Sequence, residues 1–97
     1  MPKAIWVSVY KSVTDPNALV EYAKLALPAM EGSGARILAR GMPSKVYEAG
    51  VNQRTVVVEY PSVEAAIKFY ESPAYQLAVK ALGKGAEREV RIIEAVE

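Results

Sequence analysis

Residues 59–75 read EYPSVEAAIKFYESPAY, and the rest of the fold can be worked out from this stretch. It begins where a β-branched strand ends, and it turns sharply at a proline. Ser62 suits a helix N-cap, and the apolar residues after it recur at helical spacing, which predicts a helix over residues 62–70. Ser72-Pro73 repeats the pattern of a cap followed by a proline, so we expect a second, reoriented helix over residues 73–82.

Strand patterns flank these two helices. Alternating or β-branched residues predict strands over residues 3–11, 35–41, 54–60 and 89–96. An earlier helix begins after the N-cap Asp15, and Pro28 is expected to kink it or to end it early, because proline lacks an N–H. The order strand, helix, strand, strand, helix, strand (βαββαβ) predicts an α+β, ferredoxin-like fold, with a four-stranded antiparallel sheet and the helices on one face.

The composition of the 97-residue chain narrows its possible functions. This length predicts a single domain over residues 1–97, because chains divide into domains only beyond roughly 250 residues. There is no cysteine and no histidine, which excludes thiolate chemistry and the commonest general base, and we expect no metal and no cofactor. The net charge is +1 and the basic residues are spread out, which argues against a nucleic-acid partner. The first residues resemble neither a signal peptide nor a membrane span, so we expect no membrane association and a cytoplasmic location.

The first predicted strand has two different faces. Its alternation puts three aliphatic side chains on one face: Ile5, Val7 and Val9. The other face carries Trp6, Ser8 and Tyr10. We expect the aliphatic face to pack under the helices and the second face to stay open, together with Val57 and Leu38. Such an exposed apolar area predicts a homodimer whose two sheets meet face to face and enclose a cavity.

The same alternation places charged residues in that cavity. Arg36, Arg40 and Glu59 are expected on the open face, where Arg40 and Glu59 should form an ion pair because an unpaired buried charge is costly. This pair has two interpretations. It is either a purely structural ion pair or part of an anion site, in which the Arg40 guanidinium is joined by the hydroxyl of Ser8 or Tyr10.

Other candidate residues also have both a structural and a functional interpretation. Trp6 and Tyr10 either fill the interface or form a platform on which a ligand stacks. Glu48 is either a solvated residue or, if it meets Glu59, one member of a carboxylate pair suited to acid–base chemistry. The run Glu87-Arg88-Glu89 is expected to be a solvated surface.

Three segments together form a recognisable pattern: Ala39-Arg40-Gly41, residues 54–66, and Tyr70-Glu71-Ser72-Pro73-Ala74-Tyr75-Gln76. With this pattern the chain resembles, over nearly its whole length, the bacterial and archaeal proteins grouped as domain of unknown function 1330. The resemblance implies a dimeric α+β barrel and no known activity.

The resemblance also implies a set of matching positions: Arg40, Glu48, Glu59, Ser72 and Tyr75. Ser72 and Tyr75 have a sufficient structural role, as a cap and as an anchor for the helix that follows. Where such proteins often have an arginine after the Ser-Pro-x-Tyr motif, this chain has Leu82, with Lys84 nearby as a possible substitute.

Three functional hypotheses follow. In the first, a homodimer binds a small organic ligand, an anion among the options, against Trp6, Ser8, Tyr10, Arg40 and Glu59. In the second, the protein is a cofactor-independent enzyme, monooxygenase- or isomerase-like, that acts on a small carbonyl compound. Glu59 or Glu48 would then be the base, and Arg40 would stabilise an enolate. In the third, it is a structural or stress-related dimer without a ligand.

Overall fold

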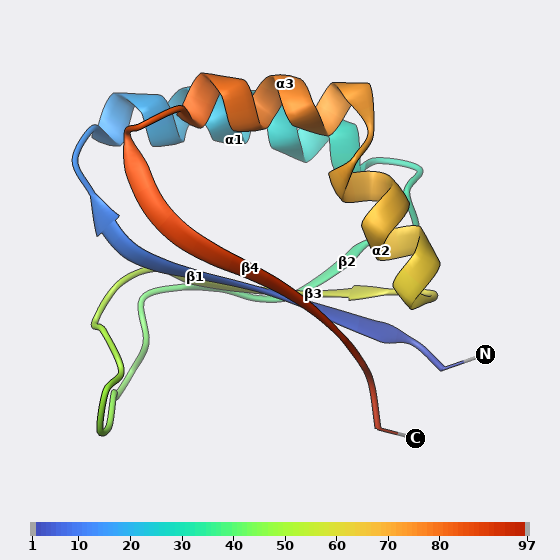
Figure 1. Ribbon diagram of the computed structural model, residues 1–97, viewed down its shortest axis with the longest axis horizontal. Coiled ribbons are helices and arrows are strands. Elements are labelled where there is room, and N and C mark those ends of the chain that lie inside the picture. The colour runs from blue at the N-terminus through green and yellow to red at the C-terminus, as the bar shows by residue number, and fades with distance from the viewer. Residues whose placement is uncertain (1, 97) are drawn as a thin grey trace.

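Four antiparallel strands form a sheet within residues 2–96, the part of the chain that the computed structural model describes, and three helices cover one face of it (Figure 1). In chain order the elements are β1 (Ala4–Val13), α1 (Pro16–Met30), β2 (Arg36–Gly41), β3 (Thr55–Tyr60), α2 (Val63–Tyr70), α3 (Pro73–Leu82) and β4 (Ala86–Glu94). The strands lie in the order β2-β3-β1-β4, and each neighbouring pair is antiparallel. This arrangement confirms the predicted α+β, ferredoxin-like fold.

Side-chain caps start the helices at the predicted residues. Asp15 caps α1, Ser62 caps α2 and Ser72 caps α3, each by accepting a hydrogen bond from a backbone N–H of the first turn. Helix α1 continues past Pro28 to Met30, so the expected early end is wrong. Pro28 lies in the last turn of α1, where the hydrogen bond that proline removes is one of the last in the helix.

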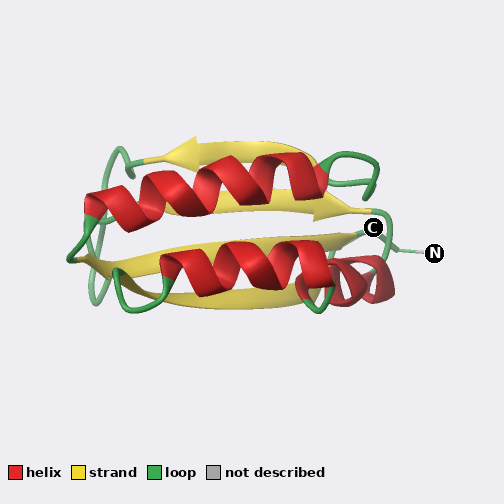
Figure 2. Ribbon diagram, turned by 90° about the horizontal axis from the view of Figure 1, so that it is seen from above, coloured by secondary structure: helices red, strands yellow, loops and turns green. Residues whose placement is uncertain are grey.

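The helices divide the covered face of the sheet between them. Figure 2 shows α1 and α3 side by side across this face, whereas α2 covers the end of the sheet at which β1 begins and β4 ends. The ring of Trp6 lies 5.8 Å from that of Phe69 on α2 and 5.5 Å from that of Tyr75 on α3, measured between ring centroids. One tryptophan on β1 therefore joins two of the helices to the sheet.

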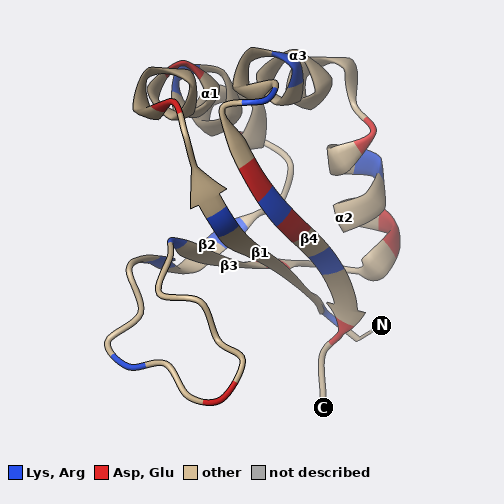
Figure 3. Cartoon of the chain, turned by 60° about the vertical axis from the view of Figure 1, so that its left-hand side comes forward, with Lys and Arg blue, Asp and Glu red and all other residues tan. Residues whose placement is uncertain are grey.

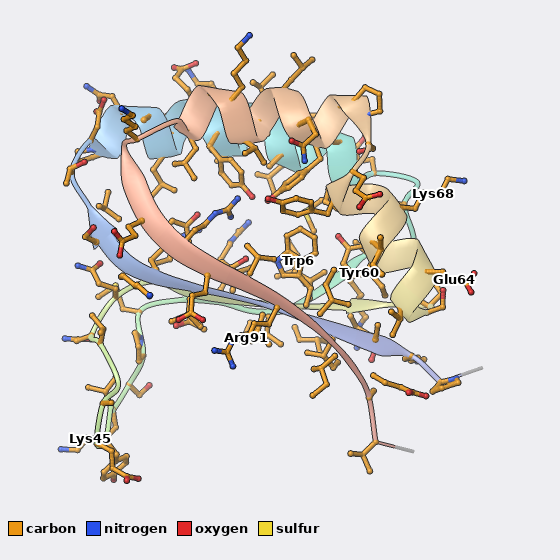
Figure 4. All side chains as sticks on the ribbon, viewed as in Figure 1. Trp6, Lys45, Tyr60, Glu64, Lys68 and Arg91 are labelled. Atoms are coloured by element: carbon orange, nitrogen blue, oxygen red, sulfur yellow. The ribbon has the colours of Figure 1, made fainter. Side chains whose placement is uncertain are left out.

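The two faces of the sheet are the reverse of those expected. The side chains of Ala4, Trp6, Ser8 and Tyr10 are buried under the helices, each with at most 3% of its surface exposed. The alternate set, Ile5, Val7 and Val9, is only partly buried and lies on the open face. Figure 4 shows Trp6 and Tyr60 on the helix side of the sheet and Arg91 on the other. Large aromatic side chains bury far more apolar area under a helix layer than valines do, and this outweighs the more uniform hydrophobicity of the aliphatic set.

A β-bulge in the edge strand β2 changes the predicted alternation. Ile37 pairs with Val58 and Ala39 pairs with Val57, so Leu38 is an extra residue in the register. Before the bulge, Arg36 pairs with Glu59 on the open face. After it, Arg40 pairs with Val56 on the helix face. The prediction that Arg36, Leu38 and Arg40 share one face is therefore wrong.

The loop between β2 and β3 projects away from the helices (Figures 1 and 3). It contains residues 45–48, which form no strand. Glu48 is exposed in this loop, with a φ of 54°. The loop therefore carries Glu48 away from the covered face of the sheet.

Candidate functional site

A cavity of about 80 Å³ lies between the helix face of the sheet and helices α1, α2 and α3. Most of its lining is apolar or aromatic, with six aromatic side chains: Trp6, Tyr10, Tyr22, Tyr60, Phe69 and Tyr75. The polar lining residues are Ser8, Arg40, Arg54 and Arg88, and among the described residues no carboxylate contributes to the lining. The cavity lies within one chain, so the side chains that were expected to face a second sheet lie under the helices instead.

The lining residues on the sheet form the floor of the cavity, and strand register places them toward one end or the other of β1. Tyr10 pairs with Arg88 on β4, and its backbone N–H donates to the carbonyl of Arg54. We call these residues, with Arg40, the arginine end. Tyr60 pairs with Ala4 at the opposite end of β1. There its ring lies 6.0 Å from that of Trp6 and 5.7 Å from that of Phe69, and these three residues form the aromatic end.

The Arg88 guanidinium is held by two tyrosine hydroxyls from the helices above it. It donates to the hydroxyl of Tyr75 on α3 at 2.9 Å and to that of Tyr22 on α1 at 3.2 Å. The two hydroxyls lie 2.6 Å apart. The guanidinium also lies 4.8 Å from the centroid of the Tyr22 ring, within the range of a cation–π interaction. Within residues 2–96, no carboxylate forms a salt bridge with Arg88.

Protonation leaves the site with hydrogen-bond donors at neutral pH. Burial raises the pKa values of the Tyr10, Tyr60 and Tyr75 hydroxyls above the ordinary tyrosine value, so these groups stay neutral. Burial alone would lower the pKa of Arg88, but the neighbouring tyrosines outweigh it and raise this pKa, so the guanidinium stays charged. A positive charge surrounded by neutral O–H groups suits an oxyanion.

Two buried hydroxyls of the lining differ in their hydrogen bonding. The hydroxyl of Ser8 accepts a hydrogen bond from the indole N–H of Trp6 at 2.7 Å. The hydroxyl of Tyr60 is buried and has no hydrogen-bond partner within the described chain. Buried polar groups are nearly always paired, so the Tyr60 hydroxyl is an exception that needs an explanation.

Arg88 also lines a second, more open hollow. This groove of about 540 Å³ lies between α2, α3 and β4, and its lining includes Tyr70, Val79 and Val90. Arg88 is the one residue that lines both hollows as they are described for residues 2–96. The side chain that carries the positive charge therefore stands in the wall between the cavity and the groove.

Four of the six predicted site residues line the cavity, and two do not. Trp6, Ser8, Tyr10 and Arg40 are brought together there. Glu59 lies on the opposite face of the sheet, where Lys3 Nζ is 3.3 Å from its carboxylate.

The expected Arg40–Glu59 ion pair is therefore wrong, because the bulge at Leu38 turns Arg40 to the helix side. Glu48 and Glu59 also do not meet. Glu48 lies in the loop before β3, and Glu59 is close to the other end of that strand.

Four residues of the site were missed or given a lesser role: Tyr22, Arg54, Tyr75 and Arg88. Tyr75 anchors α3 as predicted, but its hydroxyl also reaches the cavity. The run Glu87-Arg88-Glu89 is not wholly solvated, because Arg88 turns inward opposite Tyr10. The sequence did not reveal that Tyr10 points to the helix face. Once that is known, Arg88 must point the same way, because it pairs with Tyr10 on the neighbouring strand. Lys84, one possible substitute for the arginine that relatives often have at Leu82, does not line this cavity.

Two further features concern membranes and metals. Among the helices of the described chain, none has the length and apolar character that crossing a bilayer requires. Over residues 2–96, acidic side chains do not gather into a group that could hold a metal ion.

Comparisons with known proteins agree with this fold. A family model described as domain of unknown function (DUF1330) matches residues 3–96. A search of curated proteins found no match.

Among solved structures, a protein of unknown function from Rhodopseudomonas palustris is similar, with a TM-score of 0.76, 16% identity, and coverage of 99% of this chain and 84% of that one. A dimeric ferredoxin-like protein from Thermobifida fusca has a TM-score of 0.66 at 15% identity, with 97% and 92% coverage. SnoaB, a cofactor-independent oxygenase from Streptomyces nogalater, has a TM-score of 0.67 at 10% identity, with 100% and 96% coverage.

Proposed function

The chain belongs to the DUF1330 family, and we propose that it binds a small organic anion, a carboxylate or an enolate, in the cavity between its sheet and its helices. The observation that carries this proposal is the lining itself. It contains three arginines and no carboxylate among the described residues, and the half-buried Arg88 donates to the hydroxyls of Tyr22 and Tyr75. A partly desolvated cation without a counterion is costly, and an anionic ligand would supply that counterion.

The size and the surface of the cavity support a compact, planar ligand. At roughly 10–15 Å³ of cavity volume for each water molecule, a cavity of 80 Å³ holds about five to eight waters, which is about the room that one aromatic ring with a carboxylate needs. The aromatic end, made of Trp6, Tyr60 and Phe69, would contact the apolar part of such a ligand. The guanidinium at the arginine end would bind its oxyanion, in the manner that arginine binds carboxylates elsewhere.

The proposed working form is a cytoplasmic homodimer in which two open sheet faces meet. Val7 and Val57 pair at the centre of this face, and Ile93 nearby is 62% exposed. Ion pairs surround these apolar residues, Lys3 with Glu59 and Arg91 with Glu89. An apolar centre with a charged rim is the usual composition of an interface between subunits.

The cofactor-independent enzyme hypothesis lacks its expected base. Glu59 lies on the far face of the sheet and Glu48 in the loop before β3, so neither reaches the cavity. The raised pKa values of the buried tyrosines make their hydroxyls poor bases at neutral pH. Ligand binding is therefore the function that the residues of the site support best.

The test compares benzoate with benzamide, which has the same shape and number of non-hydrogen atoms but no charge. Trp6 is the single tryptophan of the chain and lines the cavity, so its fluorescence reports occupancy, and calorimetry gives Kd. We expect benzoate to bind at least about tenfold more tightly than benzamide, because hydrogen bonds to charged groups are worth about 1.5–3 kcal/mol.

Arg88→Met should remove the preference for benzoate, whereas Lys80→Met, on the exposed surface of α3, should retain it. Arg88→Lys keeps the charge without the planar fork and should give an intermediate preference. Equal affinities for the two compounds in the unmodified protein would refute an anion site.

A further inference from the structure

We propose that the anion bound in this cavity carries a hydrogen-bond acceptor at the end remote from its negative charge, and that the hydroxyl of Tyr60 recognises this acceptor. The inference rests on the proposed function and narrows its ligand class. The ligand would be an oxyanion with an apolar, preferably planar, middle and a carbonyl, ether or ring-nitrogen acceptor at its far end.

The Tyr60 hydroxyl is both buried and, within residues 2–96, unpaired. Tyr60 is 1% exposed, and its hydroxyl finds no partner within the described chain. The neighbouring polar group on the sheet, the indole N–H of Trp6, already donates a hydrogen bond to the Ser8 hydroxyl. A phenol that served only to fill space would be better replaced by phenylalanine, because a buried donor without an acceptor destabilises the fold.

Tyr60 and Arg88 lie toward different ends of β1. Strand register puts it opposite Ala4, whereas Arg88 is opposite Tyr10 at the other end of the same strand. The ring of Tyr60 packs against those of Trp6 and Phe69, which are also lining residues, so a ligand that contacts this end would meet Tyr60. The charge and the acceptor of the ligand would therefore be bound at opposite ends of the cavity.

The hydroxyl of Tyr60, a lining residue of the cavity, is a hydrogen-bond donor at neutral pH. Burial is the main reason that the pKa of Tyr60 is raised, and Tyr22 adds to it. Because the hydroxyl stays protonated at neutral pH, it offers a donor, and the matching group on the ligand must be an acceptor.

The experiment compares benzoate with isonicotinate, in which a ring nitrogen replaces the carbon farthest from the carboxylate. The two anions have the same size, so the ring nitrogen is the main difference between them. In the unmodified protein and in Tyr60→Phe, Kd is measured for both by calorimetry. We expect Tyr60→Phe to weaken isonicotinate about three- to tenfold and benzoate less than twofold, the range that one neutral hydrogen bond gives. Nicotinate, with its nitrogen one position nearer the carboxylate, tests where the acceptor must lie.

Tyr10→Phe is the matched control. It removes a buried hydroxyl at the arginine end, and the ratio of the two affinities should then stay as in the unmodified protein. If Tyr60→Phe changes both affinities by the same factor, or neither, the inference is wrong although the anion site stands. If benzoate and benzamide bind equally to the unmodified protein, the proposed function itself fails.

Thermal unfolding without ligand gives a second readout for Tyr60→Phe. Its midpoint should rise relative to the unmodified protein, because the variant no longer buries an unpaired donor. A lower midpoint would mean that the hydroxyl already has a partner, which would remove the basis of the inference.

Discussion

The hydroxyls of Tyr22 and Tyr75 lie 2.6 Å apart, and together they hold the Arg88 guanidinium beneath helices α1 and α3. Tyr75 belongs to the Ser-Pro-x-Tyr motif, whose serine caps α3 by accepting a hydrogen bond from the backbone N–H of Tyr75. One residue therefore takes part both in starting a helix and in orienting the positive charge of the cavity.

Tyr75→Phe should destabilise the fold. The variant leaves the aromatic packing in place but removes one of the two acceptors of the Arg88 guanidinium. We expect the free energy of unfolding to fall by about 1–3 kcal/mol, as when a buried group loses its partner. Urea denaturation measures this change. Tyr47→Phe, at a residue 74% exposed in the loop before β3, is the control and should change stability by less than about 0.5 kcal/mol. Equal midpoints for the two variants would contradict a stabilising role for the hydroxyl pair.

Stability should fall steeply above pH 10. In the folded chain the pKa values of Tyr60 and Tyr75 are raised above the ordinary value of 10, mainly by burial. Their contribution is fully present below pH 10 and is lost as the pH rises from there toward the folded pKa values, because the unfolded chain releases these protons first. Each such tyrosine makes the free energy of unfolding fall by up to about 1.4 kcal/mol more per pH unit in this range. Tyr60→Phe should make this fall in the free energy of unfolding with pH, measured by urea denaturation at several pH values, less steep. An unchanged pH dependence would show that this tyrosine titrates normally.

Arg40 and Glu59 should behave as independent residues in ligand binding, because they lie on opposite faces of the sheet. Arg40→Gln is expected to weaken benzoate about two- to fivefold, less than an Arg88 variant does, since Arg40 is an exposed lining residue. Glu59→Gln should leave the Kd for benzoate within about twofold of the original. Calorimetry checks both values, and an equal loss in the two variants would show that they act as a pair.

Val7→Lys should dissociate the proposed dimer. The substitution puts a charge beside Val57 at the centre of the open face, where pairing of two sheets would bury it without a partner. Native mass spectrometry of the freshly purified protein should show dimers for the unmodified chain and monomers for the variant, with circular dichroism to verify folding. Val20→Lys, at a residue 53% exposed on α1, is the matched control and should remain dimeric. A monomeric unmodified protein would refute the proposed assembly.

Much of the fold could be predicted because local signals agree with one another. Asp15, Ser62 and Ser72 cap helices where their spacing indicates, and the order of strands and helices leads to one antiparallel sheet. Such caps and periodicities act within a few residues, so they can be read without knowing the tertiary structure.

The position of the site depended on longer-range facts. Alternation predicts that Trp6 and Tyr10 share a face of the sheet, but it does not predict whether the helices cover that face. The aliphatic side chains of Ile5 and Val7 favoured the opposite face, which was wrong. The inward direction of Arg88 follows from its pairing with Tyr10 and not from its own neighbours in sequence. Tyr22 is part of the site because α1 lies beside α3, and no sequence motif predicts this tertiary contact.

The extra residue Leu38 has a consequence for the way relatives of this chain are compared. Deleting Leu38 would remove the bulge and leave Arg40 opposite Val56, on the helix face. A strand of the same length without the bulge would instead alternate regularly through Leu38 and turn Arg40 to the open face. Two family members of equal length with arginine in the same alignment column therefore present it to the same face only if their edge strands share the bulge.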